Sequence, residues 1–144
     1  MSIEEKQEEI IEEFSVLDGD MEMTINYIME LGDSLPELDD QYRNDDYIVK
    51  GCQSKVWMHA YLVNDKVKFD ADSNTAITKG LVSLLVRVLD GESPETIMEH
   101  DIYFPEKIGM NRFIGTQRSN GFAAMIKQMK LYALALSSKT KTGA

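Results

Sequence analysis

The sequence has one cysteine, three prolines and one tryptophan, and it lacks any long hydrophobic run. A single cysteine excludes an internal disulfide framework, so the chain does not have the pattern of a small secreted domain. The cysteine clusters and close histidine pairs that are typical of zinc sites are also missing. No segment approaches the ~20 apolar residues of a membrane span, and the first residues lack the basic and apolar regions of a signal peptide. We therefore expect a cytoplasmic protein with no membrane partner and no bound metal.

Basic residues are scarce in the first third of the chain. The net charge is −10, and residues 1–46 contain 16 acidic and 2 basic residues, against 9 acidic and 13 basic residues in the remainder. A chain this acidic repels phosphate backbones, and no stripe of interleaved basic and aromatic residues is present. Nucleic acid is therefore not an expected partner. The later, mildly basic part could favour an anionic ligand or an acidic protein surface.

The length and composition predict one folded unit. A chain of 144 residues, 43% of them hydrophobic, is long enough to bury a single core. We expect one domain over residues 1–136. Residues 137–144 lack apolar anchors and are expected to form a tail that frays.

Periodic patterns predict helices around one strand pair. Ser2 and Glu5 form a capping box ahead of an amphipathic helix, and a second helix ends near Gly32. Residues 56–63 alternate as in a strand, Asn64-Asp65 suits a tight turn, and a second strand returns. Three further helices are predicted: one over residues 76–88 after the cap-type residues Asp72-Ser73, a short one from Pro94, and a last one beginning near Ser119-Asn120. The fold class is α+β, a small antiparallel sheet packed against helices.

Cys52 is the strongest candidate for chemistry. It lies in Gly51-Cys52-Gln53-Ser54-Lys55-Val56-Trp57, where a polar loop runs into the first strand. A thiolate at the tip of a turn is a good nucleophile toward sulfur or carbonyl carbon if its proton is easily lost. The residues alone leave open the alternative of an inert buried thiol.

Other candidates lie at the predicted ends of elements. Arg118 could lower the proton affinity of a nearby sulfur or hold an anionic persulfide, and Asp72 could orient that arginine. Both residues also have structural interpretations: Arg118 could be a surface charge, and Asp72 could be a helix cap. His59 and His100 are the only possible imidazole bases for a cysteine hydrolase. Nothing in the spacing pairs either ring with Cys52.

These motifs resemble the SufE family, the sulfur-acceptor proteins that work with cysteine desulfurases. The segment from Gly51 to Trp57 is similar to the family signature. Other stretches fit in order. Leu35-Pro36 and Tyr42-Arg43 precede the cysteine, and Asp72-Ser73, Ile77-Thr78-Lys79-Gly80-Leu81 and Arg118-Ser119-Asn120-Gly121 follow it.

The resemblance implies an α+β fold shared with the IscU-like scaffolds that assemble iron–sulfur clusters. It also implies transpersulfuration: Cys52 takes sulfur from a SufS-type desulfurase, stimulates that enzyme, and delivers to a cluster scaffold complex such as SufBCD. The chain would need no cofactor of its own, because pyridoxal phosphate (PLP) belongs to the desulfurase. It would act as a carrier rather than as a stand-alone enzyme. The alternatives are a cysteine hydrolase with a Cys-His pair and a regulator that binds the desulfurase without chemistry.

Overall fold

The computed structural model describes residues 1–140. Six helices and one strand pair follow in the order α1 (Ile3–Ser15), α2 (Met21–Gly32), β1 (Val56–Val63), β2 (Lys66–Ser73), α3 (Ala76–Leu89), α4 (Pro94–Glu99), α5 (Phe104–Lys107) and α6 (Met110–Ser137). Two short 3-10 helices, η1 (Asp40–Tyr42) and η2 (Asp45–Tyr47), lie in the loop before β1. Of the expected tail, Ser137 is the last residue of α6, and residues 141–144 lie outside the described residues.

β1 and β2 form a two-stranded antiparallel sheet, so the predicted α+β class is confirmed. The register runs from Val56 opposite Ser73 to Val63 opposite Lys66. Asn64 and Asp65 connect the strands with φ values of 52° and 63°. Two consecutive residues with positive φ are what a tight hairpin turn requires, and asparagine and aspartate tolerate this conformation well.

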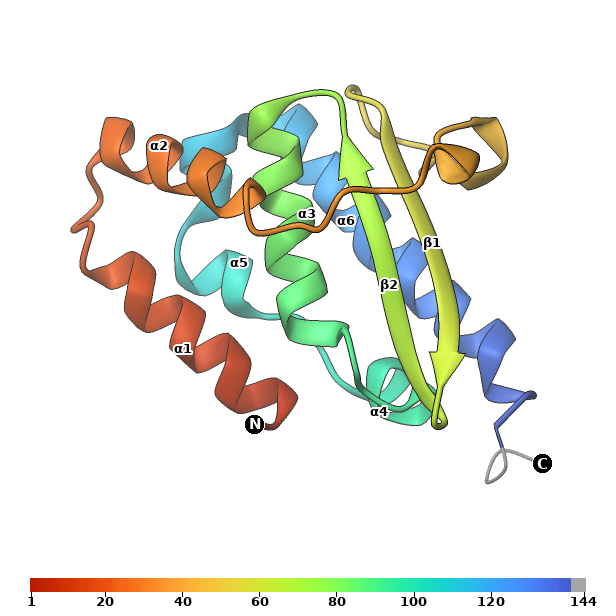
Figure 1. Ribbon diagram of the computed structural model, residues 1–144. Helices are drawn as coiled ribbons and strands as arrows, with labels where there is room; N and C mark the ends of the chain where they lie inside the picture. The colour runs from red at the N-terminus through yellow and green to blue at the C-terminus, as the bar shows by residue number, and fades with distance from the viewer. Residues whose placement is uncertain (141–144) are drawn as a thin grey trace.

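The helices pack around α3 and against the sheet. Figure 1 shows α3 between the α1–α2 pair and the hairpin, with α6 running behind the hairpin. The core contains fully buried side chains from almost every element: Ile3, Ile10, Ile28, Met58, Leu81, Leu85, Phe104 and Met125. A Cβ at Gly80 would lie 1.9 Å from the carbonyl oxygen of Ile28, so α2 and α3 make backbone contact there.

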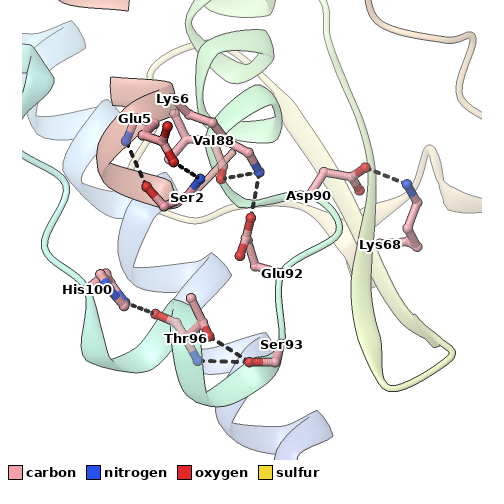
Figure 2. A network of polar contacts seen from close by, with 10 residues as sticks. All are labelled: Ser2, Glu5, Lys6, Lys68, Val88, Asp90, Glu92, Ser93, Thr96 and His100. Atoms are coloured by element: carbon pink, nitrogen blue, oxygen red, sulfur yellow. Dashed lines mark hydrogen bonds and ion pairs between the residues drawn. The ribbon is translucent and has the colours of Figure 1, made fainter. Parts of the chain in front are cut away.

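Polar contacts join the elements at the end of the molecule where the hairpin turns. The Lys6 ammonium on α1 donates to Glu92 at 2.6 Å and to the Val88 carbonyl at 3.3 Å (Figure 2). Ser2 and Glu5 form the predicted capping box, and Ser93 caps α4 with Pro94 at its start. These contacts lie at the opposite end of the hairpin from the strand ends that adjoin Cys52 (Figure 1).

The starts of two helices differ from the sequence expectations. Gly115 (φ 81°, ψ 171°) divides α6 into two helical segments: the last one starts after Gly115, a few residues before the predicted Ser119, and the segment that begins at Met110 was not predicted. Because Gly115 breaks the helix, the buried residues before it do not continue the helical spacing of those after it. The sequence pattern therefore did not reveal the first segment. Asp72 and Ser73 do not cap α3, because β2 continues through Ser73 and the N-cap residue is Thr75.

Candidate functional site

Cys52 lies on the loop that leads into β1, and this loop rests against α6. Gly51 has φ +95°, a conformation that side chains rarely adopt. A Cβ at this position would also lie 3.2 Å from the Cβ of Ala124 on α6. The Cys52 side chain is half-buried and packs against the edge of the core. The thiol is therefore sheltered by α6 and does not project from an open turn.

Cys52 lines a small, partly open cavity, which we call the inner cavity. This cavity has a volume of about 100 Å³ and is lined by residues of the Cys52 loop, α3 and α6: Cys52, Gln53, Ser54, Thr78, Leu81, Gln117, Arg118, Gly121 and Met125. The Sγ atom of Cys52 donates a hydrogen bond to the Gly121 carbonyl oxygen at 3.4 Å. A Cβ at Gly121 would lie 3.5 Å from that sulfur, so the glycine leaves free space beside it.

A second, more open cavity, which we call the outer cavity, adjoins the same cysteine. It has a volume of about 330 Å³ and is lined by Gly51, Cys52, Gln53, Gln117 and Asn120. Cys52 thus lines both cavities, which also share Gln53 and Gln117. A larger cavity of about 520 Å³, lined by Ile102, Met110 and Phe122 among others, lies elsewhere, between α5 and α6, and is not in contact with the thiol.

Burial raises the pKa of the Cys52 thiol above its ordinary value. The cause is desolvation, which penalises the charged thiolate relative to the neutral thiol. At neutral pH the free protein therefore holds Cys52 as a neutral thiol. Its hydrogen bond to a carbonyl oxygen is consistent with this state, because only the protonated sulfur can donate.

Arg118 and Cys52 line the same inner cavity. The Nη1 atom of Arg118 donates to the Ile114 carbonyl oxygen at 3.3 Å. Its guanidinium is thus bound to the turn of α6 that precedes it. Asn120, another residue at a predicted junction, lines the outer cavity.

Asp72 has partners other than the expected arginine. Its side chain is almost fully buried, and it forms ion pairs with Arg43, at the end of η1, and with Lys79, on α3, at 3.5 Å. It also accepts a hydrogen bond from the Ser73 backbone N–H at 2.8 Å. The expectation that Asp72 orients Arg118 is therefore not supported. Instead, Asp72 fixes the loop before Cys52 to the end of β2 and the start of α3.

The sequence analysis assigned no role to Arg43 beyond the family resemblance, and it did not identify three hydroxyl groups near the cysteine. Arg43 lies 5.7 Å above the ring of Trp57, in addition to its contact with Asp72. The Ser54 hydroxyl oxygen accepts from Thr75 at 2.9 Å and from Thr78 at 3.2 Å. Thr78 could have been noticed, because it precedes Leu81 by three residues and so shares a helix face with it.

Both histidines are placed in other environments. The His59 ring stacks on Tyr42 with centroids 3.9 Å apart. His100 contacts the Thr96 carbonyl through Nδ1 at 2.7 Å and Glu4 through Nε2 at 2.9 Å. Within residues 1–140, the residues lining the two cavities at Cys52 include no histidine. This arrangement gives the cysteine no imidazole base.

The described part of the chain has no candidate metal site and no candidate membrane span. Residues 1–140 contain no group of three or more histidine, cysteine, aspartate or glutamate side chains that could hold a metal ion. None of the helices in this range is both long enough and apolar enough to cross a bilayer.

Comparison with known proteins gives consistent matches over most of the chain. Residues 8–133 match the family model described as "SufE: Fe-S metabolism associated domain". An uncharacterized SufE-like protein of Rhizobium etli is 34% identical over 128 residues, which cover 85% of this chain and 86% of that protein. An uncharacterized SufE-like protein of Rhizobium meliloti is 31% identical over 128 residues, which cover 85% of this chain and 91% of that protein. A solution structure of a hypothetical protein from Thermus thermophilus has the same fold, with a TM-score of 0.73 and 22% sequence identity. The match covers 90% of this chain and 94% of that one.

Proposed function

The chain belongs to the SufE family, which is associated with iron–sulfur metabolism, and from this premise we propose that it carries sulfur on Cys52. It accepts a sulfur atom from the persulfide of a cysteine desulfurase and delivers it for iron–sulfur cluster assembly. The observation that carries the proposal is the environment of Cys52. The only cysteine of the chain lines a small, partly open cavity of about 100 Å³ and also adjoins the more open outer cavity.

The size of the inner cavity favours the transfer of a single atom. Sites for small-molecule ligands usually measure about 300–1,000 Å³, whereas one water molecule occupies about 30 Å³ in the liquid. The inner cavity therefore has room for a terminal sulfur atom but not for an ordinary small-molecule ligand. A persulfide held there is protected from the thiols and oxidants that would otherwise consume it.

The proposed reaction is thiol–disulfide exchange with the terminal sulfur as the group transferred. The Cys52 thiolate attacks the terminal sulfur of the desulfurase persulfide, and a new S–S bond forms on Cys52. The S–S bond of the donor breaks, and its cysteine leaves as a thiolate. The proton lost from Cys52 is taken up by solvent or by the leaving thiolate. No electrons are lost or gained overall.

The raised pKa of Cys52 has a consequence for this reaction. A neutral thiol is a poor nucleophile, so the free protein is slow to react with other electrophiles. We propose that docking on the desulfurase changes the environment of the thiol and favours its ionisation. Arg118 is the candidate for this effect, because it lines the same cavity as Cys52 and carries a positive charge, while its Nη1 atom donates to the Ile114 carbonyl oxygen.

The proposed partners follow from the family. The donor is a SufS-type desulfurase, whose PLP removes sulfur from free cysteine, and the acceptor is a scaffold complex such as SufBCD. In this scheme the carrier needs no cofactor and works in the cytoplasm. Stimulation of the desulfurase results because Cys52 removes the persulfide that would otherwise block the next turnover.

The two alternative functions fit the site less well. A cysteine hydrolase needs a base beside the sulfur, and both rings are placed away from it, against Tyr42 and against Thr96 and Glu4. A regulator that acts by binding alone would not need a sheltered thiol.

A transfer assay tests the proposal against both alternatives. Cysteine carrying radiolabelled sulfur is given to a cysteine desulfurase together with wild-type protein or with Cys52→Ser. We expect label on the wild-type chain alone, released by a thiol reductant, and stimulation of the desulfurase by the wild type alone. Equal stimulation by Cys52→Ser, with no label on either chain, would instead establish the binding regulator.

A further inference from the structure

A cluster of three hydroxyl groups borders the inner cavity on the side formed by α3. Ser54 Oγ accepts hydrogen bonds from Thr75 Oγ1 at 2.9 Å and from Thr78 Oγ1 at 3.2 Å. A serine hydroxyl has two lone pairs and one proton. The two threonines occupy both lone pairs, so the proton of Ser54 is left to donate to something else. Ser54 and Thr78 both line the cavity that contains the Cys52 sulfur.

The same cluster leaves the start of α3 without the usual cap. Thr75 is the N-cap residue, but its hydroxyl is directed to Ser54 rather than to the first turn of the helix. An N-cap threonine ordinarily accepts a hydrogen bond from one of the first backbone N–H groups. The uncapped first turn keeps the partial positive charge of the helix N-terminus, where an anion is favoured. Local rules are often broken in this way at functional sites.

Loading with sulfur would reverse the hydrogen-bonding needs of the site. The resting thiol donates to the Gly121 carbonyl oxygen. A hydropersulfide is a stronger acid than the thiol from which it forms, so the terminal sulfur is an anion that can only accept. A carbonyl oxygen repels such an anion, whereas a hydroxyl proton attracts it. The terminal sulfur therefore needs the donor side of the cavity.

We propose that the Ser54 hydroxyl, oriented by Thr75 and Thr78, binds the terminal sulfur of the Cys52 persulfide as an anion. This inference rests on the proposed function and adds to it a binding site for sulfane sulfur. Arg118, on the α6 wall of the cavity, supplies positive charge to the same anion. The bond lowers the reactivity of the stored sulfur toward chance electrophiles.

The test loads the protein chemically, so it does not depend on the desulfurase. Wild type, Ser54→Ala, Ser54→Thr and Thr78→Val are treated with inorganic polysulfide, freed of excess reagent, and alkylated over a range of pH. Ser34→Ala is the matched control, because its hydroxyl lies at the end of α2 and donates to the Leu31 carbonyl. The alkylated persulfide and the alkylated thiol are separated by mass, so each has its own pH profile.

We expect the midpoint of the persulfide profile to rise by about one pH unit in Ser54→Ala, the effect of losing one hydrogen bond to a charged group. Thr78→Val should show a smaller rise, and Ser54→Thr and Ser34→Ala should match the wild type. The profile of the unloaded thiol should stay unchanged in every variant. If Ser54→Ala fails to fold, Thr78→Val decides the question, since it preserves the side-chain shape.

A persulfide profile in the Ser54 and Thr78 variants that coincides with that of the wild type would overturn the inference. An equal shift of the thiol and persulfide profiles would also overturn it, because the role of Ser54 would then be structural. Neither result would affect the proposed function, which fails only if the desulfurase does not transfer sulfur to wild-type Cys52.

Discussion

Replacing Gly121 by alanine should make the protein more stable and less able to accept sulfur. The added Cβ would lie 3.5 Å from both Sγ and Cα of Cys52, which is ordinary van der Waals contact, so the fold can accommodate it. Gly121 lies in the long part of α6, and a helical alanine there is favoured over glycine by about 0.5–1 kcal/mol. The melting temperature should therefore rise by about 2–4 °C.

The same methyl group occupies space that the transferred sulfur needs. A methyl is about as large as a water molecule, ~30 Å³, and so removes roughly a third of a cavity of about 100 Å³. Because this methyl would lie 3.5 Å from Sγ, it crowds the space next to the sulfur where the transferred atom must bond, and such crowding costs about 1–3 kcal/mol. That cost slows or weakens sulfur loading by about 5- to 150-fold.

Two measurements on the same preparations check whether Gly121→Ala gains stability and loses sulfur loading together. Thermal unfolding gives the stability, and single-turnover loading from a desulfurase, followed by mass, gives the rate. Asn26→Ala is the matched control, because Asn26 is exposed on α2 and its replacement improves helix propensity without touching the site. Asn26→Ala should be more stable than the wild type and should accept sulfur at the wild-type rate. Wild-type loading in Gly121→Ala would refute the idea that the cavity receives the sulfur.

Three further outcomes follow from the site. Alkylation of Cys52 in the native protein should have a midpoint at higher pH than in the urea-unfolded chain, and a midpoint equal to or below the unfolded one would contradict its burial. The stability that this raised pKa contributes is complete below the unfolded pKa and is lost as the pH rises through the folded one. Asp72→Asn loses its pairs with Arg43 and Lys79, so we expect a loss of about 1–3 kcal/mol in denaturant unfolding; Asp40→Asn, at an exposed carboxylate, should change stability by less than about 0.5 kcal/mol. The free energy of unfolding of Cys52→Ala should lie within about 1 kcal/mol of the wild-type value, because the half-buried thiol borders a cavity. A larger loss of stability would support a structural thiol.

Features set by neighbouring residues were predictable from the sequence. The capping box at Ser2 and Glu5, the turn at Asn64-Asp65 and the proline start of α4 each depend on contacts within a few residues. The importance of Cys52 came from its local segment and from the family resemblance. The family and the fold are confirmed by matches that extend over most of the chain.

Contacts between distant segments were not predictable in the same way. Arg43 and Asp72 are separated by 29 positions, and the polar loop that holds Arg43 has no periodicity that would fix its path. The inner cavity is formed by three segments, from the Cys52 loop, α3 and α6, that meet only in the folded chain. The partners of the three hydroxyl groups also depend on how α3 meets that loop.

The intact mass of the protein after incubation with a cysteine desulfurase and cysteine tests the central claim most directly. We predict that wild type gains one sulfur atom, located on Cys52 by fragmentation and removed by a thiol reductant, and that Cys52→Ser gains none. A wild-type chain whose mass stays unchanged while the desulfurase turns over would contradict the assignment of Cys52 as a sulfur carrier.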